Sequence, residues 1–464
     1  MQKEKRFQRM GNEKMLPLIL SFSLPSVISM TSMALYNVVD TFWVGKLGTQ
    51  AIAGLTLFMP LQIFVLAFGL LIGIGAASYI SRSFGARKYE NANHVFSGTI
   101  FLGLVISAII TLLGITQLKP LLEFIGKNSG VVPQAYDYGV IIVIGVPIMV
   151  FNIILSQCAR AEGNPNIAMI SQLTGAVLNV ILDPIFIFPM KMGIKGAAWA
   201  TVISSGIGLL IILRYFTGPK SHLRFKANLM LPDKKILQEM GKSGIPSFTQ
   251  QAAAGLVTTL TNGLLAGYGA YALAIMGINN RMVMIFFMPI VGTCQGYMPI
   301  AAYNYGAGNL ARVKEAFRTA IKVVTVICVF GWLLIQIHPA MFIRIFSHDP
   351  QVIHQGIISL RVINIFLPLI GFQAIGATTY QALGRGLAGF VLSLARQVLF
   401  FLPVVLFFKL MFGLNGIFLS FPVADLGASL VTALWLRHTF KQFNSGISPT
   451  APNELKDIQG FDAI

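Results

Sequence analysis

The chain has 464 residues, of which 55% are hydrophobic and only 11% are charged. Because a water-soluble domain carries about 25% charged residues, this composition excludes a soluble globular protein, and the mean hydropathy of +0.74 agrees. The net charge of +18 is not a nucleic-acid signature, since the basic residues stand in short segments between apolar runs, as membrane topology requires. Three cysteines, none in a C-x-x-C pair, predict neither a disulfide framework nor a zinc site.

Twelve apolar runs follow one another along the chain, and a membrane span needs roughly 20 such residues. We therefore predict an all-α integral membrane protein of twelve transmembrane helices. Residues 1–14 and 441–464 are polar tails, and a basic linker, 218–242, separates an N-lobe (15–217) from a C-lobe (243–440). The runs lie at 15–40, 52–80, 94–118, 131–156, 166–190, 196–217, 243–266, 271–300, 315–337, 352–380, 387–411 and 414–436.

The basic residues also indicate how the chain is oriented. With the N-terminus inside, 24 of the 34 lysines and arginines fall on inside segments and seven on outside segments. Cytoplasmic loops of membrane proteins carry such an excess. We therefore expect a multi-pass protein of the cell membrane with an even number of spans and both termini in the cytoplasm.

An internal repeat relates the two lobes. A shift of 221 residues superimposes glycines and prolines of one half on those of the other, without a gap from the first span to the fourth. The matched pairs include Pro25 and Pro246, Gly85 and Gly306, and Pro147 and Pro368. Because each half has an even number of spans, both halves insert in the same direction around an axis along the membrane normal. The expected fold is two pseudo-symmetric six-helix lobes around a central cavity, which is typical of transporters.

Charged side chains inside the spans are functional candidates, because each costs about 2.5–3.5 kcal/mol to insert. In the N-lobe these are Asp40 in the first span and Asp183 in the fifth. Asn179 lies four residues before Asp183, and Tyr36 lies four residues before Asp40, so each shares a helix face with its aspartate. Such carboxylates can hold a hard cation or a proton. The alternative is that they only cap or hydrogen-bond helices.

Two prolines interrupt the same helices. Pro184 removes a backbone donor directly after Asp183, and Pro25 does so early in the first span. Both prolines therefore predict a bend. If a proton at Asp40 bends the first span at Pro25, protonation changes the shape of the cavity.

Six short motifs follow one another through the N-lobe. They are Leu24-Pro25, the run from Tyr36 to Gly45 (YNVVDTFWVG), Ser83-Phe84-Gly85-Ala86, Gly145-Val146-Pro147, the run from Asn179 to Pro184 (NVILDP), and the run from Gly193 to Ala198 (GIKGAA). Over residues 15–440 this order resembles the multidrug and toxic compound extrusion (MATE) family. The resemblance implies antiport, in which inward H⁺ or Na⁺ drives cationic or amphipathic compounds outward. No enzyme activity and no cofactor other than the coupling ion are then expected.

The resemblance also implies which residues form an N-lobe cation site. Some members of the family carry a carboxylate in the seventh helix, but here that helix begins PSFTQQ from Pro246. We therefore assign ion coupling to the N-lobe, where Na⁺ is the one metal ion expected. The residues at matching positions are Asp40, Asn179, Asp183 and Thr201, with the Ala197 backbone, and Tyr138.

The C-lobe contains buried charges of its own. Asp425 in the twelfth span needs a partner, and Arg281 or Arg396 is the natural one. Arg361 is a third cation within a C-lobe span. The pair is either a structural salt bridge or a charge pair that breaks between two transport states.

These observations lead to one functional hypothesis and two alternatives. One alternative, a channel or a non-transporting membrane scaffold, is disfavoured by the kinked helices, the carboxylates inside the spans and the two-fold repeat. We expect a monomeric multidrug exporter that binds cationic or amphipathic compounds, is surrounded by membrane lipids and has no nucleic-acid partner. The alternative from the same superfamily is a flippase for a lipid-linked saccharide or peptidoglycan precursor, whose pyrophosphate the three C-lobe arginines could bind. The aspartates of the N-lobe favour a cation.

Overall fold

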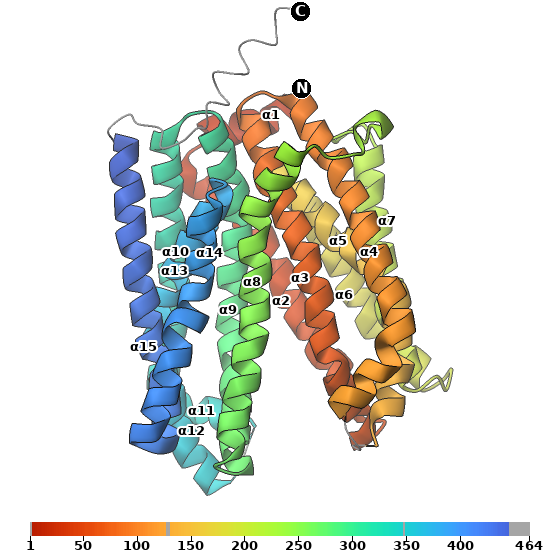
Figure 1. The fold of residues 1–464 in the computed structure, drawn as a ribbon, viewed down its shortest axis with the longest axis vertical. Helices are drawn as coiled ribbons and strands as arrows, with labels where there is room; N and C mark the ends of the chain where they lie inside the picture. Colours follow the sequence, from red (N-terminus) through yellow and green to blue (C-terminus); the bar gives the residue numbers. More distant parts are fainter. Residues whose placement is uncertain (1, 127–129, 347–348, 445–464) are drawn as a thin grey trace, which may run out of the picture.

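The computed structural model describes residues 2–126, 130–346 and 349–444, and all regular elements in these ranges are helices (Figure 1). A short helix, α1 (Gln2–Asn12), comes first, and a 3-10 turn, η1 (Ala227–Leu229), lies between the lobes. Six long helices form the N-lobe: α2 (Met15–Gly45), α3 (Thr49–Gly85), α4 (Tyr89–Gly126), α5 (Val132–Ala161), α6 (Pro165–Ile187) and α7 (Ile194–Thr217).

The helices of the C-lobe are interrupted more often. Within α15 the backbone leaves helical geometry at Gly413, with φ 59° and ψ −133°, so that two helices are joined there across a kink. The elements are α8 (Lys234–Ala266), α9 (Ala270–Gly306), α10 (Leu310–Ile337), α11 (Pro339–Arg344), α12 (Pro350–Ile363), α13 (Leu367–Ala382), α14 (Gly386–Leu394), the π-helical η2 (Ala395–Phe401) and α15 (Leu402–Asn444).

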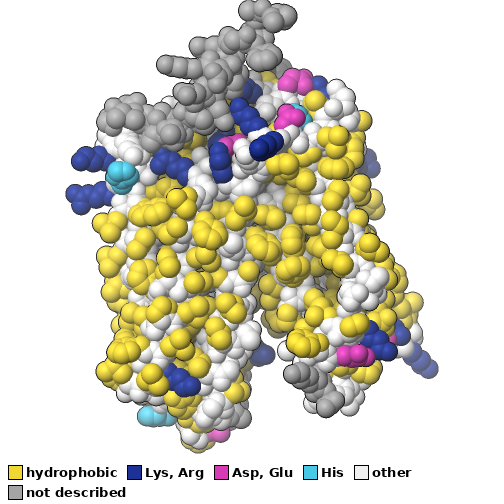
Figure 2. All heavy atoms as spheres, viewed as in Figure 1, with side chains coloured by type: hydrophobic (Ala, Val, Ile, Leu, Met, Phe, Trp, Pro, Cys, Tyr) yellow, Lys and Arg dark blue, Asp and Glu magenta, His cyan; other side chains and the backbone are white. Residues whose placement is uncertain are grey.

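The helices account for the expected membrane spans. Within the described residues, nine helices are long and apolar enough to cross a membrane when α14, η2 and α15 are taken as one. Three further spans bring the number to twelve. The last helix counts as two spans when it is divided at Gly413, α12 and α13 together form one span bent by 44°, and the long but more polar α8 is another. Hydrophobic side chains cover the middle of the face in Figure 2, with charged side chains at its ends. The all-α membrane fold is therefore confirmed.

Equivalent turns precede the second helix of each lobe. Gly48 before α3 and Gly269 before α9, which the 221-residue shift superimposes, have φ angles of 112° and 101°. Side chains with a Cβ are strained in this conformation, so glycine suits both positions. The internal repeat thus extends to backbone geometry.

The two lobes touch at one end of the molecule and separate at the other (Figure 1). At the closed end, α2 packs on α9, and α3 packs on α8 and α9. Figure 2 shows a cleft between the lobes that opens at the end away from α1. The expected pair of lobes around a central cavity is present, and the cavity is open on one side.

Glycines bring α3 and α9 into backbone contact at the closed end. A Cβ added at Gly85 would lie 1.9 Å from the carbonyl oxygen of Tyr303, and one added at Gly306 would lie 2.0 Å from that of Arg82. The 221-residue shift converts one contact into the other. The seam between the lobes is therefore a two-fold interlock with no room for a side chain at either glycine.

Polar contacts also cross the closed end. The Arg82 guanidinium on α3 lies 2.7 Å from the Glu239 carboxylate on α8. The hydroxyls of Ser78 and Ser243 are 3.0 Å apart, and both donate to the carbonyl oxygen of Gln381. Opening of this end would have to break these contacts as well as the glycine interlock.

The segments outside the lobes contain more helix than the apolar runs indicated. α8 begins at Lys234, so its first turns lie in the expected linker 218–242. The expected tail 1–14 contains α1, and α15 ends at Asn444 in the expected tail 441–464. Residues 445–464 lie outside the described ranges. Hydropathy marks only the apolar part of a helix, whereas lysine, glutamate and glutamine continue a helix readily.

Gly306→Ala should keep the closed end from forming. The added methyl group must displace the α3 backbone, and such overpacking costs about 1–3 kcal/mol. Spin labels at the exposed positions Arg214 on α7 and Ala311 on α10 should then report longer separations than in the parent protein.

The matched control for this substitution lies on the same helix. At Gly277 an added Cβ meets open space among the described residues, so Gly277→Ala should leave the separation unchanged. An unchanged separation in Gly306→Ala would contradict the interlock.

Candidate functional site

Two carboxylates meet inside the N-lobe. Asp40 lies on α2 and Asp183 on α6, and these two helices pack against each other. The Asp40 residue is 7% exposed and Asp183 is fully buried, and their carboxyl groups lie close enough to interact directly. The fold thus joins two aspartates that are far apart in the sequence.

Asn179 and Thr201 extend this cluster to α7. The Asn179 amide nitrogen, Nδ2, donates to Asp183 Oδ1 at 3.2 Å and to Thr201 Oγ1 at 3.3 Å. The Thr201 hydroxyl donates to the carbonyl oxygen of Ala197 at 3.0 Å. These residues and the aspartate pair therefore form one continuous polar cluster within the bundle.

Two tyrosines border the aspartates. Tyr36 on α2 and Tyr138 on α5 both lie close enough to Asp40 and Asp183 for electrostatic interaction with the two carboxylates. Gln62 on α3 donates from Nε2 to the Tyr138 hydroxyl at 3.1 Å. Gln62 is absent from the sequence-based site, although a lone amide within an apolar run was a signal that could have found it.

The two prolines lie at different distances from the acids. Pro184 directly follows Asp183 within α6. Pro25 is buried in α2, about four turns from Asp40, and its carbonyl oxygen accepts a hydrogen bond from the Ser29 hydroxyl at 2.9 Å. Pro184 therefore belongs to the cluster, whereas Pro25 lies nearer the closed end. Bending at either proline stays a prediction.

The cluster contains oxygen atoms that lack a donor. Among the described residues, Asp40 Oδ1, Asp183 Oδ2 and Asn179 Oδ1 are buried without a hydrogen-bond partner. Unpaired buried acceptors are costly, so this arrangement suits a proton or a hard cation, which prefers oxygen ligands. Within the described ranges, no group of three or more His, Cys, Asp or Glu side chains is placed to hold a metal ion. A sodium ion would therefore need amide, hydroxyl or carbonyl oxygens besides the two carboxylates.

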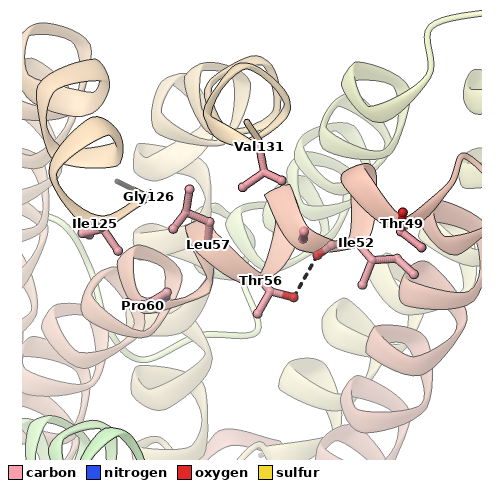
Figure 3. A pocket seen from close by; sticks show the side chains of 9 residues that line it. Thr49, Ile52, Thr56, Leu57, Pro60, Ile125, Gly126 and Val131 are labelled. Carbon is pink, nitrogen blue, oxygen red and sulfur yellow. Dashed lines mark hydrogen bonds between the residues drawn. The ribbon is translucent and has the colours of Figure 1, made fainter. Parts of the chain in front are cut away.

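Two surface pockets lie away from this cluster. A pocket of about 500 Å³ in the C-lobe includes Tyr271, His354 and Asn415. A larger pocket of about 620 Å³ at the open end of the N-lobe is mostly apolar (Figure 3). Neither contains Asp40 or Asp183. The larger pocket is lined by Thr49, Ile52, Ala53, Thr56, Leu57, Pro60, Ile125, Gly126 and Val131.

The C-lobe aspartate is paired with one of its two proposed partners. Arg396 Nε on η2 lies 2.5 Å from Asp425 Oδ1 on α15, because these two segments pack along each other. Asp425 is fully buried, while the Arg396 side chain is 30% exposed. The other proposed partner, Arg281, lies over the Phe346 ring at 5.7 Å from its centre. The structure therefore selects Arg396.

A twofold-repeated helical membrane fold with a central cleft and a buried acidic cluster defines a membrane transporter. The model of the MatE family matches the chain twice, over residues 25–185 and 246–406. These two segments are offset by the same 221 residues as the sequence repeat. The chain belongs to the MATE family of transporters.

Known relatives match this chain over most of their length. "Multidrug export protein MepA" of Staphylococcus haemolyticus (strain JCSC1435) is 30% identical over 408 residues, which cover 88% of this chain and 90% of that protein. The protein of the same name from Staphylococcus aureus (strain MRSA252) is 29% identical over 420 residues, covering 90% and 92%.

Solved structures share the fold. A crystal structure of MATE in complex with MaL6 has a TM-score of 0.90 at 26% identity, covering 95% of this chain and 99% of that one. A multidrug resistance MATE family transporter in an outward-facing conformation has a TM-score of 0.88 at 26% identity, covering 93% and 99%.

Arg396→Met should destabilise the protein by about 3–5 kcal/mol, because it leaves Asp425 buried without a counter-charge. The double variant Arg396→Met, Asp425→Leu removes both charges and should regain most of the loss. The midpoint of thermal unfolding in detergent measures both effects. Equal stability of the single variant and the parent protein would argue against a structural salt bridge. Asp425→Asn would then be tested for normal expression with uncoupled transport.

Proposed function

We propose that the protein is a secondary active multidrug efflux antiporter, which exports cationic or amphipathic compounds in exchange for H⁺ or Na⁺. Family membership supports transport, and the names of the relatives, multidrug export proteins, support efflux of several compounds. The cycle makes and breaks no covalent bond. It therefore requires no enzyme activity and no cofactor besides the coupling ion.

The observation that carries the coupling proposal is the buried aspartate pair with its unpartnered oxygens. Two neighbouring carboxylates repel each other when both are ionised, and burial weakens the screening of that repulsion by solvent. One bound H⁺ or Na⁺ relieves that repulsion. A cationic substrate favours the same negative charge, so binding of one cation promotes release of the other.

Helix α2 offers the route from the ion site to the closed end. It carries Asp40 near one end, and its other end contacts α9. A Cβ added at Gly296 of α9 would lie 2.6 Å from the backbone of Ser23, and one added at Gly292 would lie 2.6 Å from the backbone of Val27. Pro25 lies between these two contacts. In our proposal, ion binding at Asp40 changes the bend of α2 at Pro25 and so alters the seam between the lobes.

The position of the cleft supports alternating access. The excess of basic residues on one side supports cytoplasmic termini in the cell membrane, so the closed end would face the cytoplasm and the cleft the exterior. Export then requires the seam to open while the cleft closes. In this proposal the N-lobe (15–217) and the C-lobe (243–440) move as two bodies of one monomer, joined by the linker 218–242 within a lipid-covered apolar belt.

The flippase alternative has less support from the C-lobe cations. Arg396 is paired with Asp425, and Arg361 Nε donates to the carbonyl oxygen of Gln336 at 3.2 Å. Two of the three arginines thus already have partners. A pyrophosphate would have to displace these contacts, whereas a cation would meet unpartnered acceptors in the N-lobe.

Asp40→Asn and Asp183→Asn should each reduce efflux of a cationic dye such as ethidium by about tenfold or more, because neither amide can exchange a proton or offer a full charge to Na⁺. Efflux is measured from cells or inverted vesicles with H⁺ and Na⁺ gradients imposed separately. The gradient that drives dye movement identifies the coupling ion.

Asp233→Asn is the matched control, because its carboxylate is 73% exposed at the surface. It should transport dye like the parent protein. Undiminished dye efflux in both Asp40→Asn and Asp183→Asn would contradict the proposal that the coupling ion binds in the N-lobe. If cells lacking the protein lose export of cell-wall precursors while their efflux of every dye is unchanged, the flippase is favoured instead.

A further inference from the structure

Helix α1 lies across the seam at the closed end of the molecule (Figure 1). The sequence indicated a polar tail here, yet Phe7 is 6% exposed and Met10 is fully buried. A surface tail would leave such side chains in water. The helix is therefore docked on the rest of the protein, and its partners come from both lobes.

The N-lobe holds α1 through a charged and an aromatic contact. Arg6 Nη1 donates to the Tyr215 hydroxyl at 2.8 Å, and that hydroxyl donates to the buried Glu162 carboxylate at 2.9 Å. The Phe7 ring lies 4.6 Å from Phe84 and 4.7 Å from His222, between ring centres. These contacts fix the first turns of α1 on α3, α7 and the linker.

The C-lobe holds the other side of α1 with its own contacts. The same Phe7 ring stacks on Tyr303 of α9, with ring centres 6.1 Å apart and an angle of 2° between the planes. Asn304 Nδ2 donates to the carbonyl oxygen of Met10 at 3.0 Å. Directly after α1, Arg312 Nη2 on α10 donates to the carbonyl oxygen of Glu13 at 2.8 Å. Helix α1 thus bridges the two lobes, with Phe7 in contact with both.

The second half carries a shorter counterpart of this bridge, without a long helix. The 221-residue shift brings residues 2–12 onto 223–233 of the linker. There the N–H groups of Arg224 and Lys226 donate to Asn93 Oδ1 and Ser97 Oγ of α4 at 2.9 and 3.0 Å. That segment, which leads into α8 of the C-lobe, therefore packs on α4 of the N-lobe, the helix that the same shift relates to α10.

We propose that α1 is a latch that holds the closed end shut and must release the C-lobe before that end can open. Only residues 13–14 join α1 to α2, so the helix stays with the N-lobe when the lobes separate. The contacts that break are those with Tyr303, Asn304 and Arg312. This inference rests on the alternating access proposed above and adds a required step to it.

Cross-linking from Phe7 tests the latch, because this side chain touches both lobes. In a chain with Cys158, Cys294 and Cys328 replaced by alanine, Phe7→Cys is paired with Tyr303→Cys across the seam. The matched control pairs Phe7→Cys with His222→Cys on the N-lobe side. A short bismaleimide joins each pair, and dye efflux is measured before and after linking.

The link to Tyr303→Cys should reduce efflux by about tenfold or more, and the link to His222→Cys should change it by less than about twofold. Full efflux with the first link would overturn the latch. Loss of efflux with the second link would overturn the claim that α1 stays with the N-lobe.

A second measurement does not depend on transport. Spin labels at Arg214 and Ala311 report the separation of the lobes at the closed end. The variant Phe7→Ala, Arg312→Ala should shift the distance distribution to longer separations. Arg9→Ala should not, because within the described ranges its side chain bonds to the nearby Glu13 and Ser21. An unchanged distribution in the double variant would refute the latch. Absence of dye efflux in the parent, with a shifted distribution, would count against the proposed function alone.

Discussion

The contact between two carboxylates inside an apolar bundle is the constraint on which the rest of this structure depends. Asp40 and Asp183 come from different helices, so their repulsion acts between α2 and α6, and a proton or cation is needed to offset it. The same α2 continues to the closed end and packs on the C-lobe. Helix α2 therefore links the charge of the cluster mechanically to the seam between the lobes.

The scaffold is duplicated, but its polar chemistry is not. The glycine interlock obeys the 221-residue repeat on both sides of the seam. By contrast, the counterpart of Asp40 in the C-lobe is Thr261, and the buried Asp425 is already neutralised by Arg396. Symmetric packing lets the lobes close against each other, whereas an asymmetric charge gives the proposed cycle an ion site in one lobe only.

The sequence predicts contacts within one helix, but it does not predict contacts between helices that are distant in the sequence. Hydropathy located the spans, and a four-residue spacing joined Asn179 to Asp183, because both depend on a single helix. The partner of Asp425 depends on how η2 packs on α15, so the sequence left Arg281 and Arg396 equal. Gln62 was open to detection as a lone amide in an apolar run, but its hydrogen bond to Tyr138 depends on how α3 packs on α5.

The docking of α1 was also beyond the sequence. A short charged helix and a polar tail have similar composition, and the two are distinguished only by contacts with distant residues such as Tyr303 and Tyr215.

The central claim, that the coupling ion binds in the N-lobe alone, is tested most directly by counting the ions that the purified protein releases. Dye binding should release one H⁺ or one Na⁺ per chain. That release should vanish in Asp40→Asn, Asp183→Asn and persist in Asp425→Asn. Release that persisted in the double N-lobe variant would contradict the account.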